Sequence, residues 1–132
     1  MRHLLHAGRA LVLAVALGAC GDDPFVAPDQ AAGVYALESV SGRGPASGTI
    51  TLTSDGRADR QVHYTSLGSP FDQHLVGSFR IEKDFIAFNL TPSDQEAGVF
   101  WPVTGQWLGS EFTIEYADPA DGPNIIERYR RQ

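Results

Sequence analysis

Residues 48–66, GTITLTSDGRADRQVHYTS, place two strand-like runs on either side of an Asp-Gly pair. In the first run Ile50 and Leu52 alternate with threonines, so that apolar side chains take one face of a strand and polar ones the other. The pair Asp55-Gly56 tolerates the positive φ angles of a two-residue type I′ turn. The stretch therefore predicts a β-hairpin with one apolar, buried face and one polar, solvent-exposed face.

The same kind of pattern continues along the chain from residue 33. Short runs of β-branched and aromatic residues alternate with clusters of Gly, Pro, Asp and Ser, which is typical of an all-β domain. The short links at 82–84 and 109–110 predict antiparallel neighbours in a meander. The predicted strands are 33–41, 48–54, 58–66, 73–82, 84–90, 100–108, 111–117 and 124–130.

A single antiparallel sheet of eight such strands can hide its apolar face by curling until it closes, which also removes its exposed edges. Gly77 and Gly105 lie inside predicted strands and are expected at points of sharp curvature. The predicted fold is therefore all-β, an eight-stranded antiparallel up-and-down β-barrel preceded by a signal-peptide helix. Within the barrel domain we expect at most one short helical turn, in 91–98.

The N-terminus has the features of a secretory signal. Arg2 and Arg9 form a basic start, and residues 10–17 are an uninterrupted run of Ala, Leu and Val. This run is too short to span a bilayer, which takes about 20 apolar residues. The signal therefore predicts export of the chain, with no membrane-spanning helix.

The tetrapeptide Leu17-Gly18-Ala19-Cys20 at the end of this run resembles the lipobox of bacterial lipoproteins. The resemblance implies that residues 1–19 are a lipoprotein signal peptide and that the sulfur of Cys20 receives a diacylglycerol. The lipid bilayer is then a partner through the acylated Cys20. An ordinary secretory signal with an incidental cysteine is the alternative.

Gly21 follows the cysteine, where an Asp is associated with retention of similar lipoproteins in the inner membrane. The resemblance therefore implies a lipid-anchored protein of the cell envelope, with the outer membrane favoured. Residues 20–32, the lipidated cysteine and a segment with two Pro and three Asp, predict a flexible tether. Residues 33–132 are predicted to form one domain, because about 100 residues bury a single core.

The composition disfavours several classes of function. Loss of Arg2 and Arg9 with the signal leaves eight basic against sixteen acidic residues, a formal charge of −8 that makes nucleic acid a poor partner. Cys20 is the only cysteine, so no internal disulfide and no cysteine-based metal site is expected. His63 and His74 would lie close if their strands pair, but two ligands without a third make a weak metal site.

No nucleophile elbow, phosphate-binding loop, dinucleotide fingerprint or metalloprotease motif occurs in the sequence. We therefore predict a protein that is not an enzyme, with no catalytic residues, no metal and no cofactor.

The opening GVYALESVSG, the Thr-rich strand with its Asp-Gly turn, the central GSFRI and the terminal ERYR look like the small lipocalin-like (calycin-type) domains of bacterial secreted proteins. In larger lipocalins a Gly-x-Trp on the first strand closes the barrel floor, and an Arg on the last strand packs over that ring. The resemblance implies that Gly33 and Tyr35 take the Gly-x-Trp places, with Tyr for Trp. Arg128 or Arg130 is then expected to supply the cation.

Barrels of eight strands are either filled by side chains or hold one small ligand. The candidate ligand contacts are Trp101, Trp107, Phe79 and Tyr64, each with a core role as the alternative. The first hypothesis is a membrane-anchored, non-catalytic lipocalin-like lipoprotein that binds a small apolar or amphipathic ligand in its barrel. The alternative is a structural or interaction lipoprotein with a filled barrel, which meets an envelope protein through its acidic outer face. Interior volume separates the two.

Overall fold

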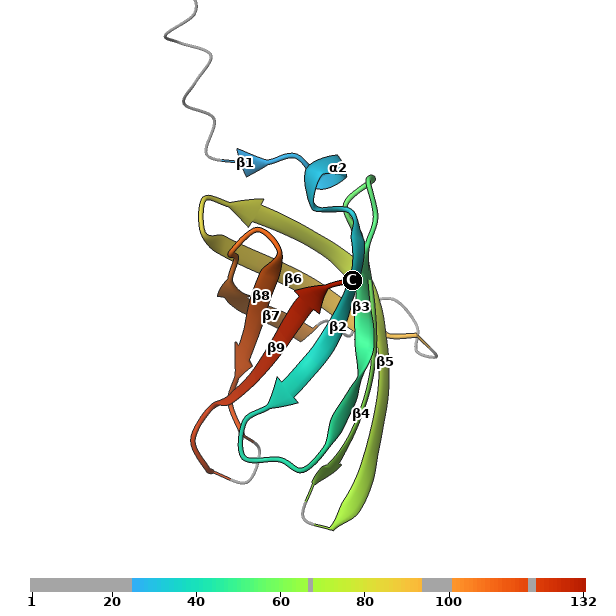
Figure 1. Ribbon diagram of the computed structural model, residues 1–132, viewed down its shortest axis with the longest axis vertical. Coiled ribbons are helices and arrows are strands. Elements are labelled where there is room, and N and C mark those ends of the chain that lie inside the picture. Colours follow the sequence, from blue (N-terminus) through green and yellow to red (C-terminus); the bar gives the residue numbers. More distant parts are fainter. Residues whose placement is uncertain (1–24, 67, 94–100, 119–120) are drawn as a thin grey trace, which may run out of the picture.

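The computed structural model describes residues 25–66, 68–93, 101–118 and 121–132, which form one closed antiparallel sheet (Figure 1). Its barrel strands are β2 (Gly33–Val40), β3 (Ala46–Leu52), β4 (Arg57–Ser66), β5 (Ser69–Glu82), β6 (Phe85–Pro92), β7 (Trp101–Gln106), β8 (Glu111–Tyr116) and β9 (Ile125–Arg131). The predicted signal-peptide helix and Cys20 lie outside the described residues.

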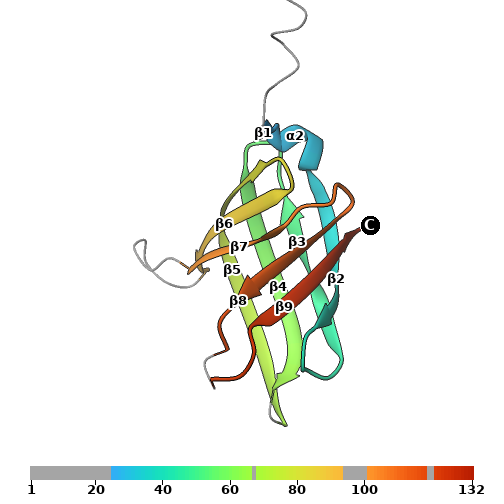
Figure 2. The ribbon, with the colours of Figure 1, turned by 90° about the vertical axis from the view of Figure 1, so that its left-hand side faces the viewer.

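Each strand from β2 to β8 pairs antiparallel with the next strand in sequence, and β9 pairs back to β2 (Figure 2). Of the nine strands in the sheet, β2–β9 form the closed eight-stranded barrel, because only β1 lies outside this ring. The predicted all-β, lipocalin-like up-and-down barrel is thereby confirmed. The largest difference in strand bounds is in β5, which begins at Ser69 and not at residue 73.

The two ends of the barrel differ. At one end, β2, β4, β6 and β8 begin next to the short turns 53–56, 83–84 and 107–110. We call this the closed end, because the helix α2 (Pro28–Ala31) lies across it (Figure 1). The opposite end, where β3, β5, β7 and β9 begin, is called the mouth.

Residues 25–31, which fall within the predicted tether of residues 20–32, contain the strand β1 and the helix α2. The strand β1 (Phe25–Val26) pairs with Glu82 and Ile81 at the end of β5. Strand β4 pairs with β5 only as far as Ser78, so the last residues of β5 have a free edge on that side, and β1 pairs with this edge. A helical turn is present at Pro28–Ala31. Of residues 91–98, where a helical turn was expected, Thr91 and Pro92 belong to β6, and 94–98 lie outside the described residues. Elements of two and four residues are too short to leave a periodic pattern.

The turn between β3 and β4 differs in type from the predicted one. Leu52 lies opposite Ala58, the amide of Thr53 donates to the carbonyl of Arg57, and the amide of Gly56 donates to the carbonyl of Thr53. Only Gly56 in the turn has a positive φ, of 84°. The loop therefore has three residues and ends on a left-handed glycine, in place of the predicted type I′ turn.

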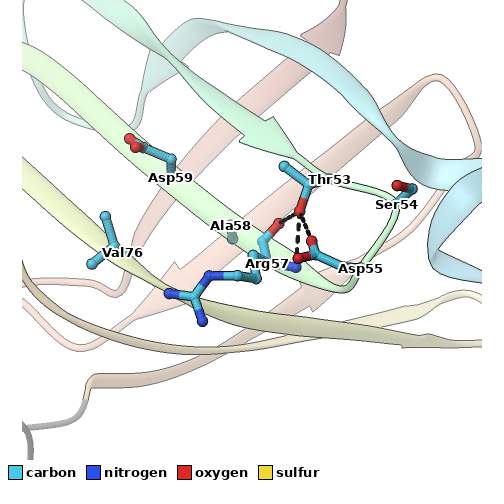
Figure 3. A pocket seen from close by; sticks show the side chains of 7 residues that line it. All are labelled: Thr53, Ser54, Asp55, Arg57, Ala58, Asp59 and Val76. Atoms are coloured by element: carbon cyan, nitrogen blue, oxygen red, sulfur yellow. Dashed lines mark hydrogen bonds between the residues drawn. The ribbon is translucent and has the colours of Figure 1, made fainter.

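The Thr53 hydroxyl accounts for this longer loop (Figure 3). It donates to the carboxylate of Asp55, and it exchanges hydrogen bonds of 3.2 Å with the backbone amide and carbonyl of Arg57. The two side chains thus satisfy polar groups within the turn. Alternation of apolar residues carries no information about these local contacts.

Gly77 of β5 and Gly105 of β7 lie where two strand backbones come close together. A Cβ atom at Gly77 would stand 2.0 Å from the carbonyl oxygen of Asn89, and one at Gly105 would stand 1.7 Å from that of Thr113. Neither position has room for a methyl group. Close approach of backbones is one of the recognised reasons for a glycine inside a strand.

We predict that Gly77→Ala and Gly105→Ala each destabilise the barrel by at least about 1–3 kcal/mol, because the backbone has to move to admit the methyl group. The free energy of unfolding in urea measures the loss. Gly44→Ala is the matched control, since nothing lies within 4 Å of a Cβ at that position. Equal stability of all three variants would contradict the assignment of Gly77 and Gly105 to close backbone contacts.

Candidate functional site

The closed end is sealed by Tyr35, whose side chain is fully buried. Its hydroxyl donates to the carbonyl of Ala31 at 2.7 Å and so holds α2 over the barrel floor. The guanidinium of Arg131 lies 5.8 Å from the centroid of the Tyr35 ring and donates to the carbonyl of Ala32. The cation and the ring thus lie together at the closed end, next to Gly33.

The cation at this end is Arg131, in place of the predicted Arg128 or Arg130. Arg128 and Arg130 are exposed on the outer face of β9, because Glu127 and Tyr129 take the inward positions of that strand. Arg131 lies opposite Tyr35 at the end of β9, where its side chain can fold across the floor beside Gly33.

The four candidate ligand contacts do not form one site. Phe79 and Trp107 are buried in an aromatic cluster toward the closed end, in ring contacts that connect the following residues: Tyr35, Phe79, Phe88, Trp107, Phe112 and Tyr129. Tyr64 is also buried but belongs to the mouth side, where its ring stacks on Phe71 at 4.6 Å between centroids. Trp101, at the start of β7, is only partly buried.

The centre of the barrel holds an ion pair that the sequence reasoning missed. Arg60 of β4 and Glu127 of β9 are both 0% exposed. Nε of Arg60 donates to Oε1 of Glu127 at 3.1 Å, and Nη2 donates to Oε2 at 2.5 Å. Nη1 donates to the side-chain oxygen of Gln73 on β5 at 2.6 Å. The bidentate pair thus joins strands that are not neighbours in the sheet.

Two tyrosines and a tryptophan complete the surroundings of this pair. The hydroxyls of Tyr116 and Tyr129 donate to opposite oxygens of the Glu127 carboxylate, the first at 2.6 Å. The guanidinium of Arg60 lies 5.2 Å from the centroid of the Trp101 ring, which packs edge-on against Tyr116. No polar side-chain atom of these residues is among the buried, unpartnered atoms of the part of the chain that the structure describes. The buried polar atoms of the network therefore find their hydrogen-bond partners within it.

Burial and charge shift the pKa values of this network in consistent directions. Burial by itself lowers the pKa of Arg60, but its interactions with Tyr129 and Glu127 outweigh that effect and raise it, so the guanidinium stays charged. Burial and then the charge of Glu127 raise the pKa of Tyr116 and of Tyr129. Both phenols therefore stay protonated and act as hydrogen-bond donors to the carboxylate.

A sequence signal for this pair does exist. Arg60 falls at an inward position of β4, between Ala58 and Val62, and Glu127 falls at an inward position of β9, between Ile125 and Tyr129. Two opposite charges at positions that alternation reserves for apolar residues predict a buried pair. The contact itself could not be predicted, because it crosses the barrel interior.

His63 and His74 lie on the outer face of the barrel, each beside an aspartate. Strands β4 and β5 do pair, but Nδ1 of His63 contacts Asp72, and Nε2 of His74 lies 2.9 Å from Asp59. Within the described ranges, no group of three or more His, Cys, Asp or Glu side chains could hold a metal ion. These contacts are exposed surface pairs.

A shallow depression of about 550 Å³ lies on the outside of β4 and β5, next to the turn that contains Asp55 (Figure 3). Its lining includes Thr53 and Arg57, whose hydrogen bonds stabilise that turn, and the apolar side chain of Val76. The fully exposed Asp55 has a lowered pKa because Thr53 donates a hydrogen bond to it. The polar groups of Thr53, Asp55 and Arg57 in this depression thus make hydrogen bonds within the turn.

Similarity to other proteins gives no indication of function, so a functional assignment has to rest on the structure of the barrel. No protein-family model, curated protein or solved structure matches this chain. The described residues include no helix that is long and apolar enough to cross a membrane.

We predict that breaking the buried pair is far more costly than breaking a surface pair. Arg60→Met or Glu127→Leu leaves a buried charge without its partner, which costs about 3–5 kcal/mol of unfolding free energy. The control is Arg130→Ala, which removes exposed pairs with Glu38 and Glu111, both at 2.8 Å, and costs about 0–1 kcal/mol.

The double variant Arg60→Met with Glu127→Leu should lose less stability than the two single changes added together. It should not recover fully, because Tyr116 and Tyr129 lose their acceptor. Additive losses in urea unfolding would contradict direct coupling of the two charges.

We predict that the barrel loses stability as the pH rises above about 10. The pKa values of Tyr35, Tyr116 and Tyr129 are raised in the folded protein, chiefly by burial, from an ordinary value of 10.0. Above that pH the unfolded chain binds fewer protons than the folded one, so the free energy of unfolding falls, by up to about 1.4 kcal/mol per group and pH unit.

Tyrosinate absorbance, followed together with circular dichroism, measures this effect. The three phenols should ionise only as the barrel unfolds. Their reversible ionisation near pH 10 with an unchanged fold would disprove the assignment.

Proposed function

We propose that the protein is a lipid-anchored, non-catalytic lipoprotein of the cell envelope, whose filled lipocalin-like barrel acts through its outer surface. The observation that carries this proposal is the close packing of the interior. The candidate contacts Phe79, Trp107 and Tyr64 are 7–8% exposed, and the ion pair beside them is 0% exposed. A cavity that holds a ligand would leave the side chains of its wall accessible to water.

The chemistry of the interior also disfavours storage of an apolar molecule. A hydrocarbon chain inside the barrel would have to pass Arg60 and Glu127, whose separation leaves two buried charges unpaired. The aromatic cluster near the closed end is occupied by its own rings, such as Phe112 and Tyr129, which stack at 5.0 Å between centroids. The interior thus supports a rigid scaffold better than a carrier.

The lipobox and the charge of the mature chain support the remaining parts of the proposal. Acylation of Cys20 would attach the domain to a bilayer, because each buried methylene of an acyl chain adds about 0.8 kcal/mol of membrane affinity. The formal charge of −8 after removal of residues 1–19 favours a basic envelope protein as a partner, and among the described acidic residues only Glu127 is buried.

Mass spectrometry of the mature protein from bacterial membranes tests the proposal. Under denaturing conditions we expect the mass of residues 20–132 with acyl groups on Cys20. Under native conditions we expect no further bound molecule. An unmodified cysteine contradicts the lipid anchor, and a stoichiometric noncovalent lipid contradicts the filled barrel.

A second candidate function is the binding of a small amphipathic molecule at the mouth. Trp101 and Tyr116 favour it, because both rings are only partly buried and lie directly above the polar network. If this function holds, a fluorescent amphipathic probe binds the protein and Trp101→Ala abolishes binding, whereas Leu108→Ala at the opposite end has no effect. Absence of probe binding to the unaltered protein excludes it.

A further inference from the structure

The exposed large apolar side chains of the described residues gather at one end of the barrel. Phe25, Phe85 and Leu108 are 53%, 47% and 56% exposed, and Val34 is 38% exposed. All four lie at the closed end, in β1, at the start of β6, in the turn after β7 and at the start of β2. Apolar side chains gathered at one end of a protein commonly mark an interaction surface.

Three of these side chains share one side of that end, which we call the closed-end patch: Phe25, Phe85 and Leu108. Phe25 and Phe85 both lie opposite Glu82 of β5, so the two rings project from the same outer face on either side of one strand. Leu108 lies in the turn after β7, two residues beyond Gln106, which lies opposite Phe85. Its neighbour Trp107 is buried, whereas Leu108 is exposed on the outside of the barrel.

The length of the chain before β1 determines which end of the barrel can meet a membrane. Only four residues separate Cys20 from Phe25. A chain extends by at most about 3.6 Å per residue, so Phe25 lies within about 18 Å of Cys20. Strand β5 runs from the mouth to the closed end in 14 residues, a length of about 45 Å at the rise of a β-strand. The link can bring the closed end, but not the mouth, to the bilayer surface.

We propose that the closed-end patch inserts into the surface of the phospholipid bilayer that holds the acyl chains of Cys20. This inference rests on the lipidation proposed above. The charges around the patch bear on which lipids it can bind. The exposed Glu82 and Asp84 lie on either side of Lys83, next to Phe85. Arg131 is also exposed at this end, where its backbone amide donates to the carbonyl of Ser110. A rim of mixed charge gives little attraction to anionic lipids, so insertion of apolar side chains provides the contact. The mouth then faces away from the membrane, where a partner can reach it.

Site-specific labelling of the lipidated protein in vesicles of phosphatidylcholine tests this orientation. Cys20 is the only cysteine and its sulfur is acylated, so Phe85→Cys or Leu108→Cys supplies a single thiol for an environment-sensitive dye. We expect a blue shift and a several-fold gain in dye emission at both positions on reconstitution, with no further gain when phosphatidylglycerol is added. The control is Ser69→Cys, an exposed position at the mouth, where no change is expected.

Flotation of the vesicles separates the two proposals. Protein that floats with the vesicles but shows the same emission at positions 85, 108 and 69 overturns the docking of the closed end while the lipid anchor stands. Protein that fails to float overturns the lipid anchor, and this inference falls with it.

Discussion

The buried ion pair between Arg60 and Glu127 constrains the whole barrel, because it fixes two strands that share no backbone hydrogen bonds. Its two charges are satisfied by four further groups: the amide of Gln73, the hydroxyls of Tyr116 and Tyr129, and the face of Trp101. Desolvation of such a pair costs several kcal/mol for each ion, so the geometry has to be good for the pair to persist. If another arrangement of the β-strands separated Arg60 from Glu127, each charge would be left unpaired in the interior.

The pair also divides the interior into two layers with different chemistry. Toward the closed end the layer is aromatic and apolar, with Phe112 packed between Tyr35 and Tyr129. Toward the mouth, the polar side chains of the network lie among apolar ones such as Val62 and Ile125, and Trp101 packs edge-on against Tyr116. Tyr129 joins the two layers, since its ring stacks on Phe112 and its hydroxyl binds Glu127. If the barrel is filled, as we propose, it presents its surface, rather than a cavity, to other molecules.

Much of the fold could be predicted from the sequence because alternation is a direct consequence of strand geometry. The rows of Ile50 and Leu52 on β3 and of Phe79 and Ile81 on β5 do face the core. Local elements without a period could not be predicted, namely β1, α2 and the three-residue loop that ends on Gly56.

The functional residues were harder to predict, for a different reason. The cation over Tyr35 was expected at Arg128 or Arg130, but both side chains point outward from β9, and Arg131 at the end of that strand takes the place. The contact between Arg60 and Glu127 depends on closure of the barrel, since the pair is separated by 67 residues. Contacts of this kind follow from the three-dimensional arrangement and not from any local pattern.

The most direct measurement is hydrogen exchange of the Arg60 Nε proton by nuclear magnetic resonance. A filled interior that is sealed around the ion pair predicts a resolved signal that exchanges with water far more slowly than those of the exposed Arg57 and Arg80. Exchange as fast as at these two surface arginines would mean that water enters the barrel, and would contradict the filled interior.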